Sequence, residues 1–324
     1  MHDSIQPAID AVEELESKTL SLYDDGRYLD AFEGLEAYGG LKALTGPSGR
    51  ALAGRLAANL GAQRYGSSIH LRAWRAQPEP NSLGFFVAME IARHWGPVRA
   101  LALLDDFREA ELTPDGMSEI ASARAYMLAS LRDFAQAERA LAQAFEATPQ
   151  RPWLHVTKGT LLAMQDRTED ATAAIREALA LRPFYRPAVQ ALADALVQQN
   201  QVAEAQSLLI EASTKLQSGQ IFLQLAQLQR ELSQYESAQR QLQAALPLLP
   251  LRHRDRDSAA EFAGFQAMLA YDNGQFDEAI RLGEESGKPF HTTVAENLRA
   301  NRESGRRVVL DVGFTLQHDV TCVP

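Results

Sequence analysis

The sequence has little cysteine, few aromatic residues and no long hydrophobic run. Cys322 is the only cysteine among 324 residues, which excludes an internal disulfide and a cysteine-cluster zinc site. The longest apolar run, 244–251, contains two prolines and is too short to span a bilayer, so we expect no membrane partner. The first ten residues show no basic segment followed by an apolar stretch, so we expect no secretory signal and a cytoplasmic location.

An excess of positive charge is also missing. The chain carries 32 Lys and Arg against 42 Asp and Glu, a net charge of −10. Proteins that bind nucleic acid concentrate basic residues, so we expect no nucleic-acid partner. The sequence contains no paired histidine ligands, no acidic calcium loop and no nucleophile elbow, so we expect no metal and no cofactor.

A repeat with a period near 34 residues organises most of the chain. Its anchor is a small residue, and successive anchors are separated by 35, 34, 37, 34, 34, 33 and 41 residues. The anchors are Ala31, Gly66, Ala100, Ala137, Ala171, Ala205, Ala238 and Ala279. A fixed period of this length is typical of stacked supersecondary units, whereas an irregular helical bundle, the alternative, does not reproduce one.

The columns around the anchor predict a helical hairpin. Twelve residues before it stands a small residue in seven of eight units, for example Gly54 and Gly159, which lets two helices approach closely. Four after it an aliphatic residue recurs in six units, and twelve after it a proline ends the second helix at Pro78, Pro149, Pro183 and Pro250.

The turn within the hairpin also recurs, and it is clearest in the first and last units. Gly26 and Gly274 are suited to the left-handed conformation that ends a first helix. An aromatic residue, such as Tyr28 or Phe276, follows two positions later and is expected to plug the hairpin. Asp133 with Gln136 forms a capping-box-like start of a second helix.

These features resemble the tetratricopeptide repeat, over about residues 12 to 300. The resemblance implies an all-α, right-handed superhelical solenoid of about eight helix-turn-helix units, and we assign residues 1–304 to it. Departures from the pattern are Gly66 at the anchor, Pro97 near a turn, and Gly283 in the last unit.

A solenoid of this kind leaves a concave face lined by its first helices. We therefore expect a scaffold that binds a protein or peptide on that face. The candidate lining residues lie one helical step apart on the first helices, and they are Phe85, Met89, Tyr126, Trp153, Thr160, Gln190, Asp194 and Leu223. Trp153 and Tyr126 could instead pack between repeats, because large aromatic residues are mostly buried. Self-association through the last helix is a third expectation, since that unit lacks an evident polar cap.

Two segments fall outside the repeat. The segment 251–257 alternates basic and acidic residues, which favours a solvated loop over a docking loop. Residues 306–314 are β-branched and alternating, which indicates a strand and a boundary near residue 304.

The tail, residues 305–324, resembles the beginning of a papain-like cysteine peptidase domain of the bacteriocin-processing type, which follows tetratricopeptide repeats in some bacterial proteins. The resemblance implies Cys322 as nucleophile and Gln317 as oxyanion donor. The alternative function is therefore the recruiting arm of a cysteine peptidase. Because no histidine base follows Cys322 in the 324 residues, we expect this chain to be catalytically inactive.

Overall fold

The computed structural model describes residues 6–301, and Gln317 and Cys322 lie outside that range. Within it, every regular element is helical, and the helices pair in chain order into eight antiparallel hairpins. The pairs are α1 (Gln6–Asp24) with α2 (Tyr28–Glu36), α3 (Gly46–Asn59) with α4 (Gln63–Ala76), α5 (Phe85–Trp95) with α6 (Pro97–Asp105), α7 (Pro114–Ser130) with α8 (Phe134–Ala147), α9 (Pro152–Ala163) with α10 (Thr168–Leu181), α11 (Arg186–Gln198) with α12 (Val202–Lys215), α13 (Gly219–Glu231) with α14 (Tyr235–Ala245), and α15 (Arg256–Asp272) with α16 (Phe276–Ser286).

A single helix, α17 (Pro289–Ala300), follows the last hairpin, and four short helical turns lie in the connections. These turns are η1 (Gly40–Ala43), η2 (Pro80–Gly84), η3 (Leu246–Leu248) and η4 (Arg252–Arg254). The predicted right-handed superhelical solenoid of about eight units is confirmed.

Every hairpin turn contains one residue with positive φ. The residues are Gly26, Gly61, Gly96, Arg132, Asp166, Asn200, Ser233 and Gly274. The prediction for Gly26 and Gly274 is confirmed, with φ of 73° and 74°. In four other units the residue with positive φ is not glycine, and its left-handed backbone conformation costs about 1 kcal/mol in each unit. The sequence pattern did not predict these four positions.

Close approach of the paired helices explains two of the departures from the repeat. A Cβ on Gly66 would lie 2.4 Å from the carbonyl oxygen of Gly54, so the α3–α4 hairpin requires glycine on both helices. A Cβ on Gly54 would in turn lie 2.1 Å from Nε2 of His70. Gly283 faces α17, where a Cβ would lie 2.8 Å from the carbonyl oxygen of His291.

Helix ends follow the sequence signals, with one exception among the plugging aromatics. Gln136 donates from its backbone N–H to Asp133 over 3.1 Å, which confirms the cap of α8. Helices α4, α8 and α10 each end two residues before the predicted proline, whereas α14 ends at Ala245, five residues before Pro250, and the short turn η3 follows it. Tyr28 is buried as expected, but Phe276 is 37% exposed, so the prediction that it plugs its hairpin is wrong.

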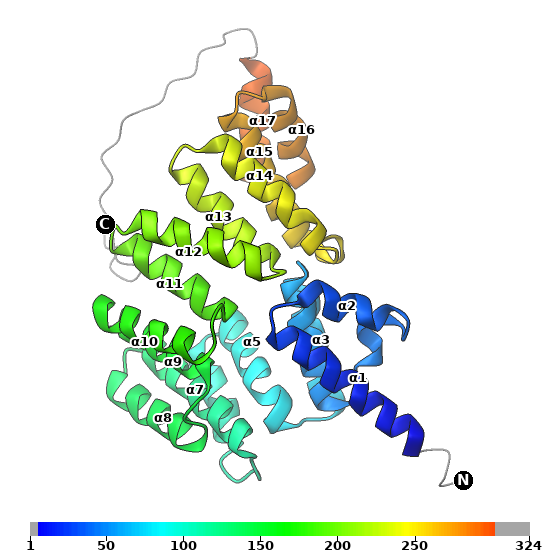
Figure 1. Ribbon diagram of the computed structural model, residues 1–324, viewed down its shortest axis with the longest axis vertical. Coiled ribbons are helices and arrows are strands. Elements are labelled where there is room, and N and C mark those ends of the chain that lie inside the picture. The colour runs from blue at the N-terminus through cyan, green and yellow to red at the C-terminus, as the bar shows by residue number, and fades with distance from the viewer. Residues whose placement is uncertain (1–5, 302–324) are drawn as a thin grey trace.

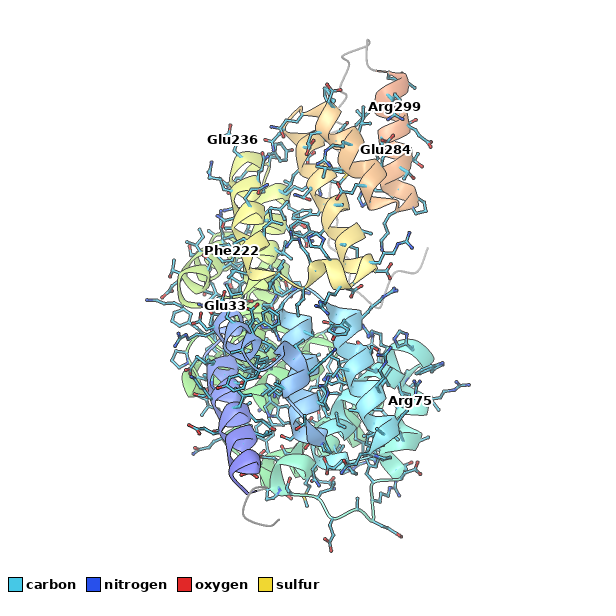
Figure 2. The ribbon with its side chains drawn as sticks, turned by 90° about the vertical axis from the view of Figure 1, so that its right-hand side faces the viewer. Glu33, Arg75, Phe222, Glu236, Glu284 and Arg299 are labelled. Carbon is cyan, nitrogen blue, oxygen red and sulfur yellow. The ribbon has the colours of Figure 1, made fainter. Side chains whose placement is uncertain are left out.

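The core is a series of apolar clusters between successive hairpins, as expected when each unit buries its stripe against its neighbours. The superhelix curves until α1–α3 lie beside α11–α13 (Figure 1). Viewed from the side, α13–α17 rise above the body formed by the earlier helices (Figure 2). This curvature determines where cavities form.

Candidate functional site

The solenoid closes on itself through contacts between its first hairpin and the α12–α13 connection. The backbone N–H of Gln217 donates to the carbonyl oxygen of Gly26 over 3.0 Å. The Gln217 amide also donates to Asp30 over 3.0 Å and accepts from the Asp30 backbone N–H over 3.3 Å. A Cβ on Gly26 would lie 2.4 Å from Cδ2 of Leu216, so glycine is needed here for packing as well as for φ. Segments about 190 residues apart are thereby joined.

A second closing contact comes from the segment 251–257. Leu251 is buried in the apolar cluster of α1–α4 and donates from its backbone to Leu60 over 3.1 Å. Asp255, only 4% exposed, accepts from the backbone N–H of Arg64 over 2.7 Å, and Asp257 forms an ion pair with the Arg64 side chain. The interpretation of this segment as a solvated loop is therefore wrong, because it docks onto the chain's own second hairpin.

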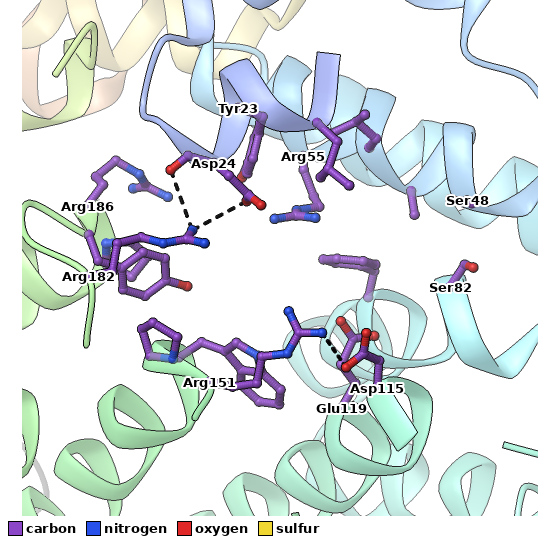
Figure 3. A pocket seen from close by; sticks show the side chains of 18 of the residues that line it. Tyr23, Asp24, Ser48, Arg55, Ser82, Asp115, Glu119, Arg151, Arg182 and Arg186 are labelled. Atoms are coloured by element: carbon purple, nitrogen blue, oxygen red, sulfur yellow. Dashed lines mark hydrogen bonds and ion pairs between the residues drawn. The ribbon is translucent and has the colours of Figure 1, made fainter. Parts of the chain in front are cut away.

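A partly open cavity of about 430 Å³ lies between the N-terminal hairpins and the starts of α7, α9 and α11. We call it the closure cavity, and its charged and aromatic lining comprises Glu16, Tyr23, Asp24, Tyr28, Arg55, Phe86, Asp115, Glu119, Arg151, Trp153, Arg182, Phe184, Tyr185 and Arg186. Figure 3 shows the guanidinium groups of Arg55, Arg151 and Arg182 converging on the cavity from different sides.

Burial raises the pKa of several groups of the closure cavity, among them Tyr28, Glu119 and Tyr185. Burial raises the pKa of Glu119 to about 7, an effect that Arg55 opposes and Asp115 reinforces. Burial, together with Tyr23, raises the pKa of Tyr185 to about 12, so its phenol stays neutral. A neutral phenol can donate a hydrogen bond to a ligand.

A larger and more open cavity, of about 1150 Å³, lies higher in the solenoid. We call it the C-terminal groove. Its lining includes Arg186, Gln190 and Asp194 from α11, Gln220, Leu223, Gln224 and Gln227 from α13, Ser258, Glu261, Phe262, Phe265 and Met268 from α15, and Phe290 and His291 from α17.

The C-terminal groove combines an apolar floor with amide groups. Leu223, Phe262 and Phe265 pack on the cluster between α13 and α15 while remaining half-buried. Gln224 donates to Asp194 over 2.7 Å, and burial raises the pKa of that carboxyl despite this bond. Apolar contacts beside amide donors and acceptors suit an extended peptide, whose backbone needs both.

The eight predicted lining residues fall into four environments. Trp153 lines the closure cavity, whereas Gln190, Asp194 and Leu223 line the C-terminal groove. Phe85, Met89 and Tyr126 pack half-buried against the apolar cluster of α5–α7. The hydroxyl of Thr160 donates within its own helix to Val156 over 3.1 Å.

The repeat pattern does not identify the arginines of the closure cavity. A signal was present, because Arg-Pro stands at the start of α9 as Arg151-Pro152 and at the start of α11 as Arg186-Pro187. Arg55 carries no comparable signal, since it lies inside α3 and meets the others only after closure.

No three His, Cys, Asp or Glu side chains within residues 6–301 are grouped so as to hold a metal ion. In the same range, no helix combines the length and apolarity needed to cross a membrane.

Solved structures share this architecture. No protein-family model matches the sequence, and no curated protein matches it either. Yeast Tom70 is similar over 86% of this chain and 60% of its own, with a TM-score of 0.60 and 18% identity. A chain of the APC/C hetero-tetramer Cut9–Hcn1 is similar over 85% of this chain and 53% of its own, with a TM-score of 0.56 and 13% identity. The fold is a tetratricopeptide-type solenoid. At these identities the likeness is one of fold alone.

Proposed function

We propose that this tetratricopeptide-type solenoid is a protein-interaction scaffold that holds an extended peptide in the C-terminal groove. The observation that carries the proposal is the continuous lining of that groove by α11, α13 and α15, the first helices of three successive hairpins. Its volume of about 1150 Å³ exceeds the upper end of the range for single small-molecule pockets, about 1,000 Å³.

The peptide would place apolar side chains on the floor and its backbone on the rim. Leu223, Phe262 and Phe265 provide the floor. Gln220 and Gln227, one on each side of Leu223, offer amides that can both donate to and accept from a peptide backbone. Both acidic and basic side chains line the groove, among them Asp194, Glu261 and Lys288, and the last two form an ion pair. We therefore expect the groove not to select a strongly charged peptide.

The experiment is selection of linear peptides from a displayed random library, followed by titration of the best binder. We expect Phe262→Ala to weaken that binder at least ten-fold, because a buried aromatic anchor is worth 2 kcal/mol or more. Phe276→Ala is the matched control, since this side chain lies on α16 and does not line the groove. Selected peptides that bind Phe262→Ala and the wild type equally well, with circular dichroism showing both folded, would refute the proposal.

A further inference from the structure

The three first helices that line the C-terminal groove run in the same direction. Gln224 of α13 donates to the carbonyl oxygen of Gln190 and to the carboxylate of Asp194, both on α11. Arg230, near the end of α13, forms an ion pair over 2.6 Å with Asp272, the last residue of α15. The groove therefore has one end at the helix starts and another at the helix ends.

The end at the helix starts carries positive charge. Arg186, the first residue of α11, donates to the hydroxyl of Tyr28 and to the amide oxygen of Gln190, which are both neutral groups. Arg252 donates over 3.1 Å to the carbonyl oxygen of Leu249, a residue that lies against the start of α13. The helix starts add the positive ends of three helix dipoles. This end of the groove can therefore accept an acidic group.

The end at the helix ends carries negative charge. Asp194 accepts from the Gln224 amide over 2.7 Å, and Glu231 accepts from the Gln227 amide over 3.2 Å. Burial and the neighbouring charge of Glu231 both raise the pKa of Asp194, so the two carboxylates lie close enough to repel each other. Within residues 6–301 neither forms an ion pair, because Arg230 is already paired with Asp272. Both side chains are exposed and can accept a basic group.

The distance between the two ends determines the spacing of charges that the groove can accept. Arg186 and Asp194 lie about two turns apart on α11, which corresponds to about 12 Å. An extended peptide covers this distance in about four residues. The pair Lys288–Glu261 and the apolar floor occupy the region between the ends, and they add no net charge.

We propose that the peptide bound in the C-terminal groove carries one acidic and one basic side chain about four positions apart. The acidic side chain lies at Arg186 and Arg252, and the basic one lies at Asp194 and Glu231. This inference rests on the proposed function and adds the charge pattern of the partner. A peptide with two like charges at this spacing would be attracted at one end of the groove and repelled at the other, so the groove selects against it.

The peptides selected from the displayed library test this charge pattern. Among binders that Phe262→Ala weakens, we expect opposite charges about four positions apart to be more frequent than like charges at the same spacing. In the best binder, replacing either charged residue by glutamine should weaken binding about five-fold, because a partly exposed ion pair has an energy of this order. Sodium chloride should weaken the original binder more than the version with both glutamines.

The outcomes separate this inference from the proposed function. Binders that depend on Phe262 but lack the opposite charges, or that keep their affinity when both charges are replaced by glutamine, would overturn the charge pattern and leave the groove as a peptide site. A library that yields no binder dependent on Phe262 would overturn both.

Variants of the protein locate the two ends. Asp194→Asn and Glu231→Gln should each weaken the best binder about five-fold, yet should not affect the version whose basic residue is glutamine. Arg186→Gln should in the same way affect only versions that carry the acidic residue. The matched control is Glu236→Gln, a change at an exposed position on α14 that does not line the groove (Figure 2). Equal losses for the charged and the glutamine versions, in variants that circular dichroism shows to be folded, would contradict the assignment.

Discussion

The pKa and the packing of single residues in the closure cavity cannot be predicted from their neighbours in the sequence. Glu119 lies on α7 among small residues, and burial against the cavity raises its pKa to about 7. Gly26 and Gly274 have nearly the same φ, yet only Gly26 lies against a distant side chain, that of Leu216. At this scale the repeat specifies backbone conformation, whereas contacts from other units specify the chemistry.

Glu119 should make stability depend on pH. Its carboxyl has an ordinary pKa of 4.5 when the chain is unfolded and about 7 when it is folded. Between these values the unfolded chain has lost the proton while the folded chain retains it, so the free energy of unfolding falls as pH rises and levels off above about 7.

Glu119→Gln removes this dependence. Relative to the wild type, its free energy of unfolding should rise by up to about 3 kcal/mol between pH 5 and pH 8 in urea titrations. Glu33→Gln, at an exposed position on α2, should retain the wild-type slope (Figure 2). An unchanged slope in Glu119→Gln would show that Glu119 is ionised throughout this range.

Paired helices depend on a few close approaches, which differ from hairpin to hairpin. In α3–α4 the backbones meet at Gly54 and Gly66, and His70 fills the space beside them. In α9–α10 the approach is made by Gly159 against Ile175. The small residue that recurs in each repeat thus lies where the two helices of a hairpin contact each other. Its size, which differs from repeat to repeat, determines how closely the helices approach.

Gly66→Ala should destabilise the protein by about 1–3 kcal/mol, because its Cβ would meet backbone that cannot move aside without separating α3 from α4. Gly34→Ala on α2 has nothing within 4 Å of its Cβ and should instead stabilise by about 0.5–1 kcal/mol through helix propensity. Urea unfolding followed by far-UV circular dichroism measures both. Equal effects of the two substitutions would mean that helix propensity, and not the close approach at Gly66, determines both.

The whole molecule is shaped by closure, which converts one concave face into two separate cavities. Gln217 and Arg64 supply side-chain contacts across the two closing junctions.

Removing both side chains should open the solenoid. We expect the double variant Gln217→Ala, Arg64→Ala to show a larger radius of gyration in small-angle X-ray scattering. The control is Arg176→Ala, Gln206→Ala, which removes an ion pair and a hydrogen bond between neighbouring hairpins and should leave the radius unchanged. A double variant at the closure with wild-type dimensions would show that the apolar contacts of Leu216 and Leu251 alone maintain it.

The sequence by itself determined the helices, their pairing and the stacking of hairpins, because these depend on contacts within one or two repeats of about 34 residues. It also located the turns at Gly26 and Gly274. That Gln190, Asp194 and Leu223 bind a partner stays a prediction. Only the tertiary structure decided that Arg55 meets Arg151 and Arg182, and that the segment 251–257 docks on α3–α4. The physical reason is that closure results from small rotations accumulated over several hairpins, and no single repeat specifies that sum.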